Sequence, residues 1–346
     1  MTMKKIDIEA HFFTKEYEEA MLKRKDFPKM EMGEDERQQR FVKWMFRPNL
    51  WAKNPFSLHQ RLLDLGENRL REMDEGGIDV QVLSLPAIGC EQLDAQEATI
   101  LARKINDELS RVIRKHPDRF IGLAEIAPQD PEGAADELER AVKELGFKGA
   151  KVNSNIRGEY LDQKKYWPIF ERAQRLDVPI SLHPSVPSPR MIEPYADYGF
   201  PLAGPTLGFI AETSLHAVRL ILGGVFDQYP GLEIILGHMG EGLPFWLSRI
   251  DILWQSQGLQ SGLSPKMTRR PSDYVKDNFI FTISGVFFQP AFMCTYLALG
   301  ADRIAFAVDA PFESYRKAVQ FMDSAPICDF DREKIYHLNA ERLFKI

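Results

Sequence analysis

Chemically capable side chains stand at the ends of several apolar segments of this chain. The first segment, IDIEAHF at residues 6–12, ends with Glu9 and His11. Residues two apart on a strand point to the same face, so a carboxylate and an imidazole would project together. An isolated pair of this kind is equally typical of a strand that runs into a solvated loop. Its significance depends on whether other segments supply partners.

Three further apolar segments end in the same way. Their chemically capable residues are His183 in VPISLH, His238 in LEIILGH and Asp309 in RIAFAVD. Each has an ordinary alternative, because a histidine can cap a turn or accept a backbone hydrogen bond and an aspartate can begin a turn. If the strand ends converge, two carboxylates with two or three imidazoles suit zinc or manganese. The sequence therefore predicts a site for a divalent transition metal.

Such convergence requires a fold whose strands all end at one rim. Short apolar runs alternate with amphipathic stretches, and most runs are continuously apolar, as parallel strands buried on both faces are. We expect strands within residues 4–10, 79–85, 120–126, 147–153, 178–183, 232–238, 278–284 and 303–309, and helices over 68–75, 95–115, 131–145 and 166–176. Strands that alternate with helices in this way predict a closed (β/α)8 TIM barrel, formed by a single domain over residues 1–346. A doubly wound open sheet is the alternative, but no G-x-G-x-x-G follows the first run.

Two connections are too long for ordinary loops. Residues 14–57 are highly charged and contain Trp44, Phe46 and Trp51, and residues 184–205 are rich in proline. Long loops in a compact domain are often functional, and in a barrel both would rise on the C-terminal face, where active sites lie. We therefore expect insertions after strands 1 and 5 and interpret 14–57 as a lid or a partner contact.

The composition of the chain argues against some classes of binding partner and some cellular locations. The net charge of -6 and the absence of a concentrated basic patch argue against nucleic acid. The sequence contains neither an apolar run long enough to span a membrane nor a recognisable signal peptide. Its cysteines, Cys90, Cys294 and Cys328, are scattered and favour reduced thiols. These features predict a cytoplasmic protein.

The strand-end motifs also resemble a known superfamily. E-A-H at the first strand, SLHP at the fifth, LGHMGEGLPFWLSRID at the sixth and FAVDAPFE at the eighth are similar to the amidohydrolases. More narrowly, they resemble the aromatic acid decarboxylases of that superfamily, which act on γ-resorcylate, 2,3-dihydroxybenzoate and 5-carboxyvanillate. Glutamate at the first position is typical of the branch that acts on hydroxybenzoates, whereas most members carry H-x-H.

The resemblance implies a single zinc or manganese ion. Lys151, near the end of the fourth strand, is the only candidate for bridging a second metal. The metal ligands implied by the resemblance are Glu9, His11, His183 and Asp309.

The resemblance further implies an aromatic carboxylate as substrate and a homodimer or homotetramer as the assembly. His238, Glu241 and Arg249 would line the substrate site, and Phe312 would lie beside the ring. From the residues alone, Arg249 is equally typical of a solvated helix arginine paired with Asp251, and Phe312 is equally typical of core packing.

Decarboxylation of a hydroxybenzoate imposes its own requirements. Direct loss of CO2 would leave an aryl anion with no electron sink, so the ring carbon must be protonated first. An ionised ortho hydroxyl makes that carbon basic, and a metal that chelates the carboxylate and the phenolate serves as Lewis acid and template. We predict that Asp309 is the general acid, with a pKa raised by burial beside other carboxylates. His238, oriented by Glu241, would hold the substrate oxygens.

Two other functions use the same residues. A metal-dependent hydrolase of a lactone, ester or amide would employ the ion to activate water, and a hydratase is a variant of that chemistry. A barrel that stores or binds metal without catalysis is a further alternative. The reaction product and a turnover assay would separate these three.

Overall fold

Parallel strands form the centre of the protein, and their order follows the sequence. The computed structural model describes residues 3–258 and 267–346. Each strand range expected from the sequence overlaps a strand of the barrel, so the prediction is confirmed, although β1 extends one residue further and the range 120–126 is divided into two short strands. These strands are β1 (Ile6–His11), β5 (Val80–Ser84), β6 and β7 (Phe120–Gly122 and Ala124–Glu125), β8 (Ala150–Asn153), β9 (Ile180–His183), β10 (Ile234–Leu236), β11 (Phe279–Thr282) and β12 (Ile304–Ala305).

Backbone hydrogen bonds close these strands into a barrel. Continuous parallel pairing joins β1 to β5 and β6, and joins β7 through β8, β9, β10 and β11 to β12. Between β6 and β7, the Leu123 amide donates to the Leu83 carbonyl at 3.0 Å. At the other seam, the amides of Ile8 and Asp309 donate to the carbonyls of Phe306 and Glu9 at 3.1 Å and 3.0 Å. The architecture is the expected (β/α)8 barrel.

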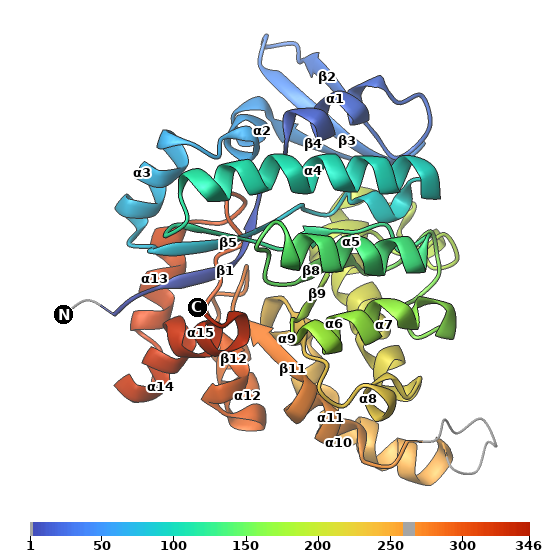
Figure 1. The fold of residues 1–346 in the computed structure, drawn as a ribbon, viewed down its shortest axis with the longest axis vertical. Coiled ribbons are helices and arrows are strands. Elements are labelled where there is room, and N and C mark those ends of the chain that lie inside the picture. The colour runs from blue at the N-terminus through green and yellow to red at the C-terminus, as the bar shows by residue number, and fades with distance from the viewer. Residues whose placement is uncertain (1–2, 259–266) are drawn as a thin grey trace.

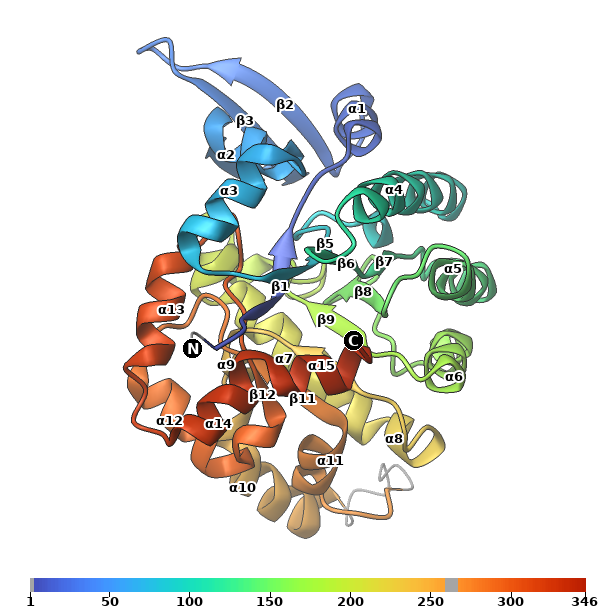
Figure 2. The ribbon, with the colours of Figure 1, turned by 60° about the vertical axis from the view of Figure 1, so that its left-hand side comes forward.

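Helices surround the strands in a ring (Figures 1 and 2). The four helices expected from the sequence are α3 (Glu67–Gly76), α4 (Ala95–Lys115), α5 (Pro131–Lys143) and α6 (Trp167–Leu176). Asp94 caps α4 and Asp130 caps α5, each accepting a hydrogen bond from an amide three residues on. Further helices are α2 (Phe56–Leu63), α7 (Gly208–Leu222), α8 (Val225–Gln228), α9 (His238–Glu241), α10 (Leu243–Leu253), α11 (Pro271–Asn278), α12 (Gln289–Leu299), α13 (Tyr315–Asp323), α14 (Asp329–Glu333) and α15 (Asn339–Phe344). No helix in the described ranges is long and apolar enough to cross a membrane.

The segment after β1 forms a small sheet rather than an irregular loop. It contains α1 (Lys15–Lys23) and the antiparallel strands β2 (Lys29–Glu34), β3 (Arg40–Arg47) and β4 (Leu50–Pro55), which project beyond the barrel in Figure 2. Along β3, alternate residues are buried, among them Trp44 and Phe46. Phe46 stacks on Phe200 from the segment after β9, with ring centroids 5.3 Å apart. The two long insertions therefore meet each other.

The pairing of β1 with β5 contains an irregularity close to Glu9, and the side chain of Glu9 reaches the interior of the barrel. Ile6 and Ile8 belong to an interior cluster that also contains Ile280 from β11 and Phe344 from α15. Regular alternation would turn Glu9 away from the interior that Ile8 faces. The pairing of β1 with β5 shifts between Asp7 and Ala10, and the side chain of Glu9 reaches the residues of β11. This irregularity lies directly beside the chemically capable residues, where bulges are common.

Candidate metal centre and active site

Three of the predicted ligands lie together at the C-terminal rim of the barrel. Glu9, His11 and His183 each offer a ligand atom, and these atoms lie within 4.8 Å of one another. All three side chains are buried. Asp309 joins them, because its Oδ1 lies 3.1 Å from Nε2 of His11. Nε2 of His11 is buried, and no group in the described part of the chain donates a hydrogen bond to it, so its lone pair remains available to a metal ion.

The two imidazoles are held with their Nε2 atoms available for a metal. Nδ1 of His183 lies 2.9 Å from the carbonyl oxygen of Pro184, and Nδ1 of His11 lies 3.3 Å from that of Ser84. A carbonyl only accepts hydrogen bonds, so each Nδ1 carries the proton and each Nε2 keeps its lone pair. Burial, reinforced by the charges of His11 and Lys151, lowers the pKa of His183 well below its ordinary value. The neutral form of His183, which is the form that ligates metals, is therefore favoured.

Two hydroxyl groups, one at the end of β11 and one just after it, orient the side chain of Glu9. Its Oε2 accepts hydrogen bonds from Oγ1 of Thr282 at 2.8 Å and from Oγ of Ser284 at 2.6 Å. Its Oε1 faces the imidazoles and lies 3.9 Å from Nε2 of His183. A Cβ atom at Gly237 would come within 3.1 Å of this Oε1, so a glycine leaves room for it. The carboxylate and imidazole donors fit zinc or manganese.

His238 and Glu241 form a pair beside these ligands. Nδ1 of His238 lies 2.7 Å from Oε1 of Glu241, and its Nε2 points toward Asp309, 3.8 Å from Oδ2. Burial opposes a charge on His238, but the carboxylates of Glu241 and Glu9 outweigh burial and raise the pKa of His238 well above its ordinary value. His238, Glu241 and Asp309 have φ angles of 52°, 52° and 72°, which non-glycine residues rarely adopt. Backbone strain of this kind concentrates at functional sites.

The expected direction of the Asp309 pKa is wrong for the protein without substrate. Burial alone raises the pKa of this carboxyl group. The neighbouring imidazoles of His11 and His238 outweigh burial and lower the pKa of Asp309 below its ordinary value. The sequence could not indicate this result, because it depends on two imidazoles from distant strands. Asp309 is therefore ionised before substrate binds and must gain a proton before it can deliver one.

A buried ion pair lies behind His183. Nζ of Lys151 lies 3.1 Å from Oε2 of Glu125, and both side chains are almost fully inaccessible to solvent. Asn153 connects this pair to the site, since its Oδ1 lies 3.2 Å from Nδ1 of His183 and its Nδ2 donates to Oε1 of Glu91 at 2.8 Å. Sequence reasoning missed Glu91, Glu125 and Asn153. The position of Asn153 two residues after Lys151 on β8 is the only signal that could have indicated it.

A small cavity of about 210 Å³ adjoins the metal residues. An apolar cavity of about 150 Å³ can hold benzene, so this volume suits one substituted ring. Phe312 lies beside His11, with ring centroids 5.6 Å apart. Aromatic and proline side chains dominate the wall, which consists of Trp44, Phe46, Ala52, Asn54, Pro86, Ala87, His183, Pro184, Phe200, Pro205, Phe209, His238, Asp309, Phe312 and Glu313.

The structure does not bring Arg249 to this cavity. Its side chain is exposed on α10, and it is absent from the cavity wall. Asp251, its alternative partner, instead accepts hydrogen bonds from the amide and hydroxyl of Ser272. Sequence reasoning also missed Asn54 and Glu313, although Glu313 belongs to the quoted FAVDAPFE motif.

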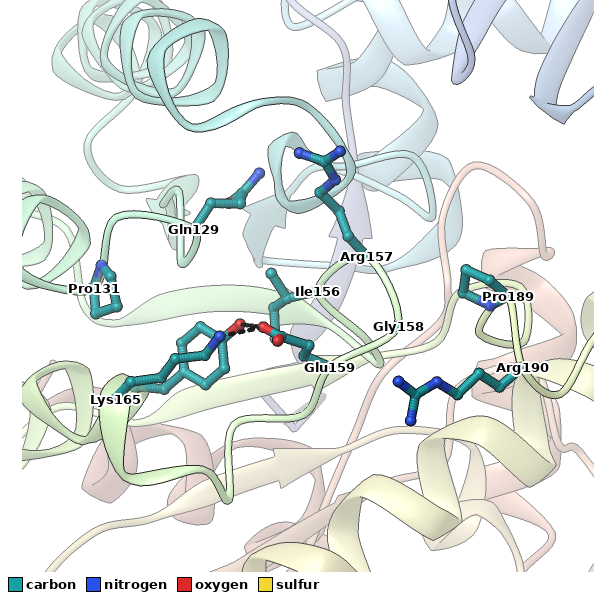
Figure 3. A pocket seen from close by; sticks show the side chains of 10 residues that line it. Gln129, Pro131, Ile156, Arg157, Gly158, Glu159, Lys165, Pro189 and Arg190 are labelled. Carbon is teal, nitrogen blue, oxygen red and sulfur yellow. Dashed lines mark hydrogen bonds and ion pairs between the residues drawn. The ribbon is translucent and has the colours of Figure 1, made fainter.

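A larger hollow of about 450 Å³ opens elsewhere on the surface (Figure 3). Its walls include Arg157 and Arg190, and its carboxylate, Glu159, is paired with Lys165 and with the hydroxyl of Tyr166. It contains none of the metal-ligand residues. Size alone therefore does not identify the active site, whereas the convergence of ligands does.

A (β/α)8 barrel with carboxylates and imidazoles gathered at its C-terminal rim defines a class of metal-dependent barrel enzymes. The amidohydrolase family model matches residues 6–346, and the chain belongs to this family. It is 43% identical over 296 residues to γ-resorcylate decarboxylase from Polaromonas sp. strain JS666, a match that covers 84% of this chain and 90% of that relative.

Two solved structures share the fold over nearly the whole chain. The 5-carboxyvanillate decarboxylase from Sphingomonas paucimobilis is 33% identical, has a TM-score of 0.88 and is covered completely, as is this chain. The dihydroxybenzoic acid decarboxylase from Polaromonas sp. JS666, solved with manganese and the inhibitor 2-nitroresorcinol, is 39% identical with a TM-score of 0.83. That match covers 99% of this chain and 97% of the relative.

Proposed function

We propose that this protein is a metal-dependent, non-oxidative decarboxylase of a hydroxybenzoate-type aromatic acid. The observation that carries the proposal is the position of the ligand group beside an apolar cavity with room for one ring. The similarity to decarboxylases of γ-resorcylate and 5-carboxyvanillate supports the reaction type. Glu9, His11, His183 and Asp309 would hold one divalent ion, manganese or zinc.

The residues of the cavity would position the substrate for protonation. When bound by these residues, the ion would supply Lewis acidity toward the oxygens of the substrate. Trp44, Phe46 and Phe312 would enclose the ring and exclude water, so that the segment 14–57 acts as a lid within one chain. The raised pKa of His238 favours its cationic form, which would donate a hydrogen bond to a substrate oxygen while Glu241 fixes the ring.

Proton transfer would proceed through Asp309. The ortho hydroxyl of the substrate would give its proton to the ionised Asp309, and Asp309 would then deliver that proton to the ring carbon that bears the carboxylate. Cleavage of the bond to the carboxyl carbon would release CO2 and return the electron pair to the ring, which restores aromaticity. The product would leave as a phenolate that takes a proton from solvent.

Arg249 remains a predicted substrate-binding residue. Within a single chain, however, its side chain is exposed and lies outside the cavity, which does not support that role.

We also propose a homo-oligomer, because α10 exposes neighbouring apolar side chains, with Phe245 69% and Trp246 51% accessible. Exposed patches of this kind commonly mark protein contacts. The three free cysteines favour action in the cytoplasm.

A product assay tests the function directly. We expect the manganese-loaded protein to release CO2 from at least one 2-hydroxybenzoate, measured as gas release together with the loss of ultraviolet absorbance. The proposal fails if no hydroxybenzoate reacts and a lactone, ester or amide is hydrolysed instead. A protein that binds metal but turns over none of these compounds would support the storage alternative.

A further inference from the structure

The ring cavity adjoins two successive hollows on the side of β8 and β9. The nearer hollow, of about 320 Å³, shares Phe46 and Ala87 with the wall of the ring cavity. It shares Arg157 and Pro189 with the larger surface hollow of about 450 Å³ (Figure 3). The three spaces therefore follow one another from the surface to the proposed metal ligands.

The side chains that line these two hollows are predominantly cationic. The wall of the nearer hollow contains Arg47 and Arg157 and no carboxylate. The larger hollow contains Arg157, Arg190 and Lys165, and its one carboxylate, Glu159, is paired with Lys165 at 2.5 Å. Four cationic side chains against one carboxylate leave an excess of three positive charges, in a chain whose net charge is -6.

The two outer arginines have no partner that neutralises them. Arg157 and Arg190 are exposed, and neither guanidinium group forms an ion pair or a hydrogen bond within the described ranges. In Figure 3, the dashed lines lead to Glu159 and none reaches either arginine. Because exposed ion pairs stabilise only weakly, such groups act on a passing anion chiefly by attraction at a distance.

Arg47 continues the cationic wall inward to the ring cavity. It follows Phe46 on β3 and donates to the carbonyl of Pro187 at 3.0 Å. Its side chain is half-buried in the nearer hollow and forms no ion pair in the part of the chain that the structure describes. Glu212, whose charge acts on Arg47, is buried outside the hollow and accepts a hydrogen bond from the hydroxyl of Tyr160 at 2.9 Å.

A third hollow adjoins the ring cavity but is electrically balanced. It has a volume of about 420 Å³ and shares Phe312 and Glu313 with the cavity. Its three cations face three carboxylates, and the charged side chains are Arg61, Arg316, Lys317, Glu72, Glu75 and Glu313. An anion therefore gains little by approaching the cavity from this side.

We infer that the anionic substrate is drawn to the ring cavity through the two cationic hollows, guided by Arg47, Arg157 and Arg190. This inference rests on the proposed function, because the guided group is the carboxylate that the reaction consumes. Clefts lined by charges of one sign raise the association rate of an oppositely charged ligand by about 10- to 1,000-fold. Decarboxylation removes that charge from the ring as CO2, so the same arginines attract the product less than the substrate.

Association kinetics test the inference. The probes are 2-hydroxybenzoate, which is an anion, and 2-hydroxybenzamide, which has the same ring and hydroxyl group but no charge. Trp44 lines the ring cavity, so stopped-flow quenching of tryptophan fluorescence reports entry into the manganese-loaded protein. At an ionic strength of about 0.01 M, the double variant Arg157→Gln with Arg190→Gln should take up 2-hydroxybenzoate about 3- to 10-fold more slowly than the wild type. This difference should disappear at about 1 M, and uptake of 2-hydroxybenzamide should not change.

Two further double variants separate charge from shape and one route from the other. Arg157→Lys with Arg190→Lys retains both charges and should retain the rate. Arg316→Gln with Lys317→Gln is the matched control in the balanced hollow and should also retain it.

Four outcomes would overturn the inference. They are equal rates in the wild type and the Arg157→Gln, Arg190→Gln protein, an equal loss in the lysine variant, a larger loss in the Arg316→Gln, Lys317→Gln protein, and no quenching of the wild type by 2-hydroxybenzoate. The proposed function is judged separately, by CO2 release. A protein that releases CO2 but takes up the anion independently of these arginines would retain the function and lose the inference.

Discussion

Oδ1 of Asn153 lies 3.2 Å from Nδ1 of His183 and 3.3 Å from Nζ of Lys151. One amide oxygen therefore connects the imidazole of a proposed metal ligand to a buried lysine, which is itself paired with Glu125. The amide nitrogen of Asn153 is fixed from the other side by Glu91 at 2.8 Å. The amide cannot rotate without losing several of these contacts. This arrangement fixes the direction in which Nε2 of His183 points.

The first prediction follows from that arrangement. Asn153→Ala should weaken manganese affinity by roughly 10- to 100-fold, as the loss of an outer partner of a metal-ligating histidine does. The measurement is a competition titration with a chelator of known affinity. Asn339→Ala is the matched control, because Asn339 is a buried asparagine that donates to the carbonyls of Ala301 and Ile304. Equal metal affinity in Asn153→Ala and the wild type would contradict the positioning role.

The second prediction concerns the metal itself. Four candidate ligands around one point imply about one divalent ion per chain in the purified protein. His183→Ala should lose both the ion and the activity, measured by elemental analysis and CO2 release on the same sample. His116→Ala, on the outside of the barrel at the end of α4, should retain both. Full activity in a preparation shown to be free of metal would refute the proposed centre.

The third prediction concerns acid stability and a buried histidine that is not among the proposed site residues. Nε2 of His216 accepts a hydrogen bond from the Leu161 amide at 2.9 Å, and its Nδ1 lies 2.7 Å from the Ser154 carbonyl. Burial lowers the pKa of His216 from 6.5 to about 3. The unfolded chain therefore binds a proton below pH 6.5 that the folded protein does not, and stability is lost as the pH falls from 6.5 toward 3.

At a pH of about 4.5, this histidine should lower the free energy of unfolding by about 3 kcal/mol relative to neutral pH. His216→Gln keeps one donor and one acceptor but cannot be protonated in this range, so its pH dependence should be flatter by a similar amount. Urea unfolding at both pH values measures the difference, and His116→Gln serves as the control. Parallel pH profiles for His216→Gln and the wild type would show that the buried imidazole does not determine the loss.

Much of the barrel could be predicted because its strands and helices carry local signals. Continuous apolar runs indicated the strands, and the proline, acids and glycine around α5 indicated its ends. The antiparallel sheet of the first insertion was missed, although the alternation of buried Val42, Trp44 and Phe46 along β3 is a strand signal. The charged residues Arg40, Lys43 and Arg47 in and around this run made it resemble a solvated loop.

The sequence indicated which residues form the site better than it indicated the interactions that surround them. Glu9 and His11 lie at the end of β1, His183 ends β9 and Asp309 follows β12 by four residues. Parallel strands of a barrel must end at one rim, so these residues could be expected to meet. The pKa of Asp309 and the ion pair of Lys151 with Glu125 instead depend on distances between strands of the barrel. Those distances join residues far apart in the sequence, and no local pattern records them.

The last prediction separates the decarboxylase from the hydrolase. An amide oxygen coordinates metal weakly but cannot carry the transferred proton, so Asp309→Asn should retain part of its metal and lose several orders of magnitude in rate. In D2O, the wild-type protein should place a single deuterium on the carbon that lost CO2, measured by NMR of the product. The substrate should require a hydroxyl ortho to its carboxylate, because a meta or para hydroxyl cannot share one ion with that carboxylate. Comparable turnover of benzoates that lack any ortho hydroxyl would refute this mechanism, and an Asp309→Asn protein with near wild-type rate would remove Asp309 from the proton path.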